Sequence, residues 1–200
     1  MAGSVSVRFA AREDAAAILK IYEKYIRNTT VTFEIEVPEI SAFEERMARI
    51  TEQFPWLVCE IDGEIAGYAY ASKHGERAAY RWSADLSVYI DERYHRRGIA
   101  AALYEAVQSL LRAQGYFTVY AGVSTPNPKS EAFHTSQGFR NLGEFKNVGH
   151  KLGQWCGVTW YERPLSEYVE KPDEPVSIHG ISWESCVAAL SVAEKKIGLG

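Results

Sequence analysis

The sequence from Asp85 to Gln114 reads DLSVYIDERYHRRGIAAALYEAVQSLLRAQ and contains three kinds of local structure in succession. It begins with an apolar, β-branched run, Leu86 to Ile90, which is typical of a strand. A short basic turn follows, His95-Arg96-Arg97-Gly98. Apolar residues then recur at the spacing of one helix face, at Ala100, Leu103, Val107, Leu110 and Leu111. The stretch therefore predicts a strand, a glycine turn and an amphipathic helix.

The basic turn has the properties of a phosphate or pyrophosphate site. The first turn of a helix has free backbone N–H groups and the positive end of the helix dipole. Gly98 has no Cβ, so we expect a ligand to approach its backbone closely. The alternative is a solvated helix start. Neither a P-loop motif nor a G-x-G-x-x-G dinucleotide motif occurs in the sequence.

The residues His95 to Ala100, HRRGIA, resemble the acyl-CoA pyrophosphate motif of the GNAT N-acetyltransferases, [Q/R]-x-x-G-x-[G/A]. The glycine and the final small residue match the pattern. His95 departs from it, because Gln or Arg is usual there. The resemblance implies that acetyl-CoA is the co-substrate and that no metal takes part.

Composition limits the class of protein. The chain has 200 residues, of which 46% are hydrophobic, enough for one ordinary domain with or without an appendage. Its net charge of −4 argues against nucleic acid as a general partner. No apolar run has membrane-spanning length and no secretory signal is visible, so we expect a cytoplasmic protein without a membrane partner. Cys59, Cys156 and Cys186 show no disulfide or metal spacing, and we expect buried thiols.

Periodicity along the chain predicts a mixed sheet with helices on its faces, an α/β (α+β) fold. Ser41 to Glu44 has the pattern of a capping box that opens a helix. Asp62-Gly63 between two apolar runs predicts a hairpin. The expected strands are Val5–Phe9, 56–61, 64–70, 80–90, 117–123, 139–145 and 157–163, and the expected helices are 11–28, one opened at Ser41, one from Ala100 to Gly115, 130–137 and 182–197.

This order of elements also resembles the GNAT fold. The resemblance implies that two central parallel strands splay apart, here those that end near Ile90 and Val123, and that acyl-CoA inserts between them. Pro164 ends the domain pattern, and Lys171 to Pro175 reads as a linker. We therefore expect a GNAT domain over residues 1–165 and a linker with a helical extension over residues 166–200.

Four runs are similar to one GNAT branch, the phosphinothricin and methionine sulfoximine or sulfone N-acetyltransferases. They are PWLVCEIDGEIAGYAYA, ERAAYRWSADLSVYI, RRGIAAALYEAV and PNPKSEAFHTSQGF, and the similarity extends over roughly Val5 to Leu165. It implies direct transfer of an acetyl group in a ternary complex to the α-amine of a small amino-acid-like acceptor. It also implies a homodimer.

The same resemblance implies which residues hold acetyl-CoA. The pantetheine arm pairs with the strand backbone at Val88, Tyr89 and Ile90. The pyrophosphate lies on the amides of Arg96, Arg97, Gly98, Ile99, Ala100 and Ala101. Asn127 gives a side-chain hydrogen bond to the cofactor arm, although an Asn in a loop flanked by prolines is otherwise a routine turn residue.

For catalysis, the resemblance implies Asp85 as the base that deprotonates the amine. The branch usually has Glu at this position, and the shorter side chain favours a relay through water. The alternative for Asp85 is a surface salt bridge. His134 is in the position of a branch histidine that assists proton transfer; the alternative is a structural histidine.

The resemblance implies an acceptor pocket in which Arg77, Tyr80 and Tyr70 hold the acid group of the substrate. Phe33 forms a wall, and Tyr89 donates a hydrogen bond near the thioester. The alternatives are simple packing for the aromatic residues and a solvated charge for Arg77, next to Glu76.

Two other functions stay open from the sequence. One is acetylation of a protein N-terminus or a polyamine, although a polyamine favours acidic walls over Arg77. The other is a non-catalytic acyl-CoA sensor, which the shorter carboxylate at Asp85 favours.

Overall fold

The computed structural model describes residues 4–198. The elements follow one another in the predicted order. They are β1 (Val5–Phe9), α1 (Ala15–Asn28), α2 (Ile40–Thr51), β2 (Trp56–Ile61), β3 (Glu64–Lys73), β4 (Ser83–Ile90), α3 (Ile99–Gln114), β5 (Thr118–Thr125), α4 (Pro128–Ser136), β6 (Arg140–Lys151), β7 (Gln154–Pro164) and α5 (Trp183–Lys196), with 3₁₀ turns at Arg12–Asp14, Ala78–Tyr80, Glu92–Tyr94 and Ile178–Gly180. Helices α1 to α4 lie between strands of the sheet, and α5 follows the last strand.

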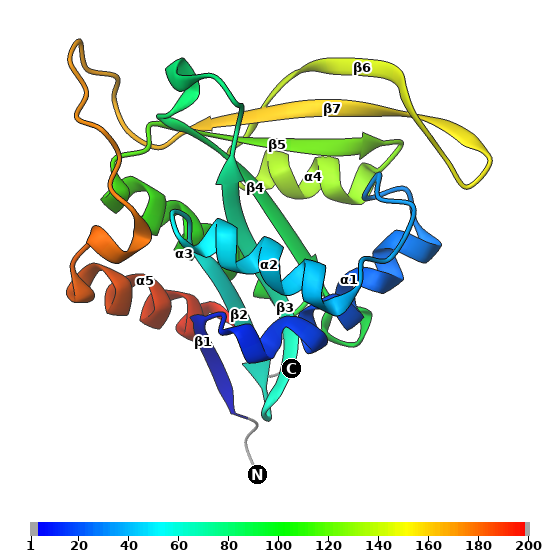
Figure 1. Ribbon diagram of the computed structural model, residues 1–200, viewed down its shortest axis with the longest axis horizontal. Coiled ribbons are helices and arrows are strands. Elements are labelled where there is room, and N and C mark those ends of the chain that lie inside the picture. The colour runs from blue at the N-terminus through cyan, green and yellow to red at the C-terminus, as the bar shows by residue number, and fades with distance from the viewer. Residues whose placement is uncertain (1–3, 199–200) are drawn as a thin grey trace.

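The strands of the described residues form one sheet in the order β1-β2-β3-β4-β5-β7-β6. Its β4–β5 pair is parallel and its other pairs are antiparallel. Helices α1 and α2 pack over one face, around Trp56 and Tyr68, while α3 and α5 cover the other (Figure 1). The predicted mixed sheet with helices on both faces is confirmed.

The two parallel strands separate after a short paired segment. Ser83 to Asp85 pair with Thr118 to Tyr120, and the pairing ends there although β4 continues to Ile90 and β5 to Thr125. The separation opens toward the carboxyl ends of both strands, where β4 leads into the basic turn and α3 (Figure 1). The predicted splay of the central strands is therefore confirmed.

Two predicted turns have the expected backbone. Asp62 and Gly63 have φ of +53° and +81°, the left-handed pair that a two-residue hairpin requires. Helix α3 ends at Gly115, whose φ is +95°.

Three predicted boundaries are wrong. The capping box at Ser41 does not form, because Phe43 N–H bonds to the carbonyl of Glu39 and this bond already places Ser41 inside the first turn of α2. The strand expected from Tyr80 begins at Ser83, after the 3₁₀ turn. The β6–β7 hairpin extends far beyond the two predicted strands. The sequence did not indicate this length, because the outer part of the hairpin is exposed and lacks the apolar pattern of a core strand.

The C-terminal segment packs onto the main core. Helix α5 begins after Ser182, whose hydroxyl accepts a hydrogen bond from Ser185 N–H. Its inward residues and the segment before it join the core beneath α3, at Ile178, Cys186, Ala189, Ala193 and Ile197. Glu194 accepts a hydrogen bond from the Val7 N–H at 2.9 Å, which ties α5 to β1. The division of the chain at residue 165 stays a prediction.

Candidate active site

The start of α3 leaves backbone N–H groups without acceptors. Gly98 is the N-cap and has no side chain to cap the helix. The first intrahelical bond runs from Ala102 N–H to the Gly98 carbonyl at 3.0 Å. The amides of Ile99, Ala100 and Ala101 therefore have no partner within residues 4–198, and an anion is the natural acceptor.

Two guanidinium groups flank these amides. Arg96 is exposed and has φ of +64°. Arg97 lies over the ring of Tyr94, 5.3 Å from its centroid. In the described part of the chain neither guanidinium forms an ion pair. The turn thus combines free amides with uncompensated positive charge, which fits the pyrophosphate of an acyl-CoA.

The structure adds a reason for a glycine at position 98 that the sequence did not indicate. Its φ is +80°, and a Cβ built there would lie 3.2 Å from the carbonyl oxygen of Lys196. Gly198 N–H also bonds to the Arg97 carbonyl at 3.1 Å. The space in which a Cβ would lie is bordered by the C-terminal segment, and the close approach of a ligand to the Gly98 backbone stays a prediction.

The edge of β4 that faces the gap offers few free backbone groups. Asp91 N–H bonds to the Ala66 carbonyl, so by alternation Ile90, Val88 and Leu86 turn their backbone groups toward β5. The Ile90 carbonyl already accepts the Tyr25 hydroxyl at 2.6 Å. Val88 lies beyond the last paired residue of β4 and β5. Pairing of a pantetheine arm with Val88 and Ile90 stays a prediction; the backbone of Tyr89 faces β3 instead.

Asp85 lies at the point where the strands separate, opposite Tyr120. Its Oδ1 is 2.6 Å from Nδ1 of His74. Burial raises the pKa of Asp85, and the hydrogen bond from His74 offsets part of that rise. The partner of Asp85 is a half-buried imidazole, and its role as the base stays a prediction.

His74 was not singled out from the sequence, and no motif in its surroundings could have indicated it. Its ring stacks on Tyr120 with centroids 4.1 Å apart. Tyr80 and Trp160 meet it edge-on at 5.6 and 6.0 Å. His74 also lines a cavity of about 450 Å³ together with Tyr120, Leu142, Gly143, Glu144, Phe145 and Trp160. The carboxylate at the strand separation is thereby linked to a mostly apolar cavity.

His134 has its two ring nitrogens engaged by the protein. Nδ1 is 2.8 Å from the Ser130 carbonyl, and Nε2 is 3.0 Å from the Tyr104 hydroxyl. Burial lowers the pKa of His134, so the neutral imidazole is favoured. The Tyr104 hydroxyl is also 3.5 Å from the Leu86 carbonyl on the gap edge of β4. A part for His134 in proton transfer stays a prediction, and it would run through Tyr104.

Asn127 caps α4. Its Oδ1 accepts a hydrogen bond from Ser130 N–H at 3.2 Å, while its side-chain nitrogen has no acceptor within the described residues. The cap positions the side chain, and contact with acetyl-CoA stays a prediction.

The expected acceptor residues fall into separate places. Tyr70 stacks on Trp56 at 4.2 Å, and Tyr89 joins the same aromatic cluster beneath α1. Phe33 lies against Gly149 of β6. Tyr80 reaches the His74 ring, as described above, whereas Arg77 is exposed at the start of the 3₁₀ turn. The structure therefore brings Tyr80 close to Asp85, through His74, and leaves Arg77 without an ion-pair partner among residues 4–198.

A second pair of charges near Tyr70 also escaped the sequence analysis. Arg46 of α2 is 2.6 Å from Glu34, which also accepts the Tyr22 hydroxyl at 3.0 Å. Burial raises the pKa of Tyr70, and the charges of Arg46, Glu34 and Asp85 act on its hydroxyl. A half-buried arginine thus lies on the acceptor side of the sheet.

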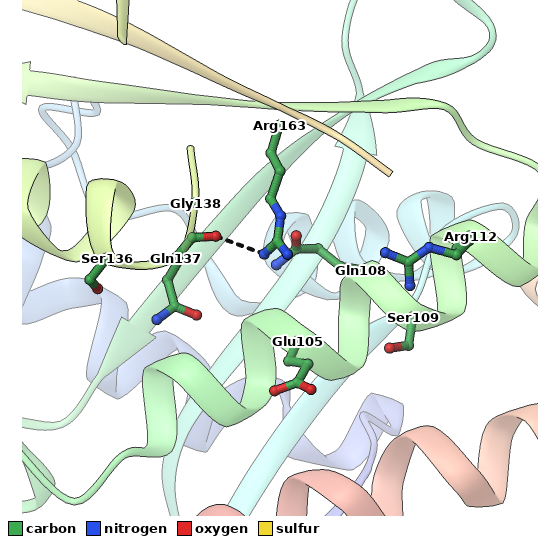
Figure 2. Close-up of a pocket in the computed structure, with 8 residues that line it drawn as sticks. All are labelled: Glu105, Gln108, Ser109, Arg112, Ser136, Gln137, Gly138 and Arg163. Carbon is green, nitrogen blue, oxygen red and sulfur yellow. Dashed lines mark hydrogen bonds between the residues drawn. The ribbon is translucent and has the colours of Figure 1, made fainter. Parts of the chain in front are cut away.

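A separate polar cavity of about 460 Å³ lies between α3 and the end of α4 (Figure 2). Arg163 donates to the Gln137 carbonyl, and Arg112 donates to the Leu165 carbonyl. Leu86 packs against α3, so Asp85, one residue earlier, faces the opposite side of the sheet. The residues at the strand separation therefore do not reach this cavity.

Other classes of site are not indicated. In the described range no group of three or more His, Cys, Asp or Glu side chains could hold a metal ion. Its helices are too short or too polar to cross a membrane.

Comparison with known proteins agrees with this geometry. Residues 7–160 match the acetyltransferase (GNAT) domain family. The chain is 33% identical to a phosphinothricin N-acetyltransferase of Streptomyces viridochromogenes, over 86% of this chain and 93% of that protein. It is 30% identical to an L-methionine sulfoximine/L-methionine sulfone acetyltransferase of Pseudomonas paraeruginosa, over 81% and 95%.

The fold comparison gives the same result. A phosphinothricin acetyltransferase of the GNAT superfamily from Sinorhizobium meliloti, solved in complex with acetyl-CoA, superposes with a TM-score of 0.82. It is 30% identical, and the match covers 90% of this chain and 98% of that one. The chain belongs to the GNAT acetyltransferase family, whose co-substrate is acetyl-CoA, and is an N-acetyltransferase.

Proposed function

We propose that the protein transfers the acetyl group of acetyl-CoA to the α-amine of a small amino-acid-like acceptor, by direct attack in a ternary complex. The observation that carries the proposal is the alignment of three features along β4. Uncapped amides begin α3, the strands part beyond Asp85, and a carboxylate bonded to an imidazole lies where they part. Relatives named for phosphinothricin and methionine sulfoximine or sulfone support the acceptor class.

In this scheme the turn holds the pyrophosphate through the amides of residues 96–101, with Arg96 and Arg97 supplying charge. The gap edge of β4 aligns the pantetheine arm at Val88, so that the acyl end lies near Asp85. The proton of the amine is accepted at Asp85 or at the imidazole bonded to it, which form one hydrogen-bonded unit. A covalent acyl-enzyme is not part of the proposal, because the described cysteines are buried and burial raises the pKa of Cys59 to about 12.

The acid group of the acceptor needs a cation. Arg77 remains the proposed partner, helped by the hydroxyls of Tyr80 and Tyr70, with Phe33 as a wall. A guanidinium at Arg77 also argues against a polyamine acceptor, which would be repelled. Its exposure leaves it free to close on a bound carboxylate or phosphinate.

We also propose a homodimer and a cytoplasmic setting. The β6–β7 hairpin projects past the end of β5 (Figure 1), and its outer part exposes Val148, Leu152 and Trp155. Exposed apolar groups that gather in one place favour association, and a second copy of the chain is the simplest partner. Free buried thiols fit a reducing compartment.

The test is acetyl-CoA turnover on methionine sulfone, methionine sulfoximine, phosphinothricin and the common amino acids. We expect turnover on at least one compound that combines an α-amine with an acid group. Asp85→Ala, measured beside the wild type, should lower kcat by about 10²-fold or more, the usual share of a general base. Acetyl-CoA that binds with no turnover on any amine would instead identify a sensor.

A further inference from the structure

We infer that the imidazole of His74, held in place by Asp85, accepts the proton of the acceptor amine, and that the side chain of the acceptor occupies the cavity over β5, β6 and β7. The inference rests on the proposed function and assigns its base. Asp85 then orients the base, which makes Asp85 a positioning residue.

The first step of the argument is the geometry of the pair. His74 follows β3 and Asp85 lies on the adjacent strand β4, and their side chains meet at 2.6 Å. The stack on Tyr120 holds the imidazole plane, because Tyr120 is the residue opposite Asp85 across the last paired step of β4 and β5. The ring is therefore held from two sides at the point where the thioester is expected.

The second step is which nitrogen is free. Asp85 occupies Nδ1, and a carboxylate bonded to a ring nitrogen favours the tautomer with the proton on that nitrogen. The lone pair is then on Nε2, which makes no hydrogen bond within residues 4–198. This is the arrangement in which a carboxylate aligns an imidazole so that its other nitrogen can accept a proton.

The third step is access to the acceptor. His74 lines the cavity of about 450 Å³, whereas Asp85 is not among its lining residues. The walls are largely apolar, with Phe145 and Trp160 among them, and Glu144 is the acidic residue of the lining. The apolar or sulfur-bearing side chain of a small amino acid fits such a space, and its acid group is left to Arg77, as in the proposed function. The amine of this acceptor meets the imidazole before it meets the carboxylate.

The shorter carboxylate has a physical reason in this arrangement. A glutamate at position 85 would extend about one methylene farther and would meet the ring of His74 at the observed backbone spacing. With aspartate at position 85, the His74 ring fits between the carboxylate and the amine of the acceptor. His74 thus takes the place that a water relay would otherwise fill.

The proposed transfer balances in protons and bonds. The acceptor arrives as an ammonium, and one proton passes to Nε2 of His74 and then to solvent. The amine nitrogen forms a bond to the acetyl carbon while the carbon–sulfur bond breaks. The second proton of the nitrogen ends on the released coenzyme A thiolate. The products are the N-acetylated acceptor and free coenzyme A, with one proton released.

The test uses the full chain and the best acceptor from the substrate panel, with kcat/KM measured from pH 5.5 to 9.5. His74→Phe keeps an aromatic ring on Tyr120 and removes both nitrogens. We expect it to lower kcat/KM for the amine by about 10²-fold or more while the KM for acetyl-CoA is unchanged. In the wild type, kcat/KM should rise with pH as the base loses its proton. In His74→Phe this rise should instead follow the pKa of the acceptor amine. The titratable groups that face His74 are Asp85, Tyr80, Tyr120 and Glu144.

Two further variants separate His74 from Asp85. Asp85→Asn keeps the shape of the positioning residue, and the double variant with His74→Phe should be no slower than His74→Phe alone, because the two act as one unit. His179→Phe, on the Thr51 carbonyl and away from the cavity, is the matched control and should match the wild type. His74→Ala should regain activity with added imidazole, which checks the inference even if His74→Phe folds poorly.

The outcomes are distinct. Wild-type-like kcat/KM and pH profile in His74→Phe overturn the inference and leave the proposed function intact. Losses that multiply in the double variant also overturn it, since Asp85 would then act directly, and so does a folded His74→Ala that imidazole does not restore. A wild type that binds acetyl-CoA and acetylates no amine overturns both proposals.

Discussion

At the scale of single residues, Gly98 meets two structural requirements, one of backbone conformation and one of space. Its left-handed backbone aims the amides of α3 outward, and its missing Cβ lets the Lys196 carbonyl approach. For a residue other than glycine, this left-handed conformation lowers stability by about 1–2 kcal/mol. The motif glycine is therefore tied to the C-terminal segment as well as to the uncapped start of α3.

Replacement of Gly98 by Ala separates these two requirements. We expect Gly98→Ala to lower the free energy of unfolding by about 2 kcal/mol or more and to weaken acetyl-CoA binding. Gly63→Ala is the matched control, because Gly63 has nearly the same φ, +81°, and has no atom within 4 Å of the added Cβ. It should cost about 1 kcal/mol and leave binding unchanged. Urea unfolding and calorimetric titration measure both quantities; equal effects at the two glycines would show that the Lys196 contact is unimportant.

At the scale of elements, α5 supports the start of α3. It packs along α3 and β1, and its end brings Lys196 and Gly198 to the basic turn. Lys196 also forms an ion pair with Glu105 on α3, which at half exposure adds little to stability. The apolar contact of α5 therefore dominates, and displacement of α5 should disturb the pyrophosphate turn.

A charge on the inner face of α5 tests this support. Ala193 is 1% exposed, and Ala193→Asp would bury a charge without a partner. We expect a loss of about 3 kcal/mol in the free energy of unfolding and weaker binding of acetyl-CoA. Val192→Asp adds the same charge one residue earlier at a side chain that is 44% exposed, and it should change stability by less than about 0.5 kcal/mol. Wild-type affinity in a folded Ala193→Asp protein would exclude a role of α5 in binding.

At the scale of the whole molecule, the long β6–β7 hairpin carries large apolar side chains that one copy of the chain leaves exposed. Its inner portion, at Leu142 and Phe145, borders the proposed acceptor cavity, and its outer portion exposes Trp155. Association through the outer portion would also fix the wall of the cavity. The homodimer and the acceptor site are thus expected to depend on the same hairpin.

Size-exclusion chromatography with light scattering checks the dimer. We expect the wild type to elute as a dimer and a Val148→Asp, Trp155→Asp variant to elute as a monomer, since two charges on an apolar interface are costly. Trp183→Asp is the control, because Trp183 is as exposed as Trp155, at 71% and 65%, but lies on α5. It should remain dimeric. A monomeric wild type would remove the dimer from the proposal.

The sequence by itself determined the features that depend on short spacings. Period-two and helical patterns gave the order of strands and helices, Asp62-Gly63 gave a hairpin, and Gly98 before an amphipathic helix gave the uncapped start of α3. These three features depend only on backbone geometry within a few neighbouring residues. The run of exposed residues in the outer β6–β7 hairpin carried no such period, and its length was missed.

Only the tertiary structure decided the partners of the chemical groups. His74 and Asp85 are joined because β3 and β4 pair in one register, His134 is confined because α4 packs its ring against Tyr104, and Gly98 meets Lys196 because α5 folds back on α3. Each contact links residues that are far apart in the chain or on different elements. No spacing in the sequence records such a contact, because strand register and helix packing result from the burial of the whole core.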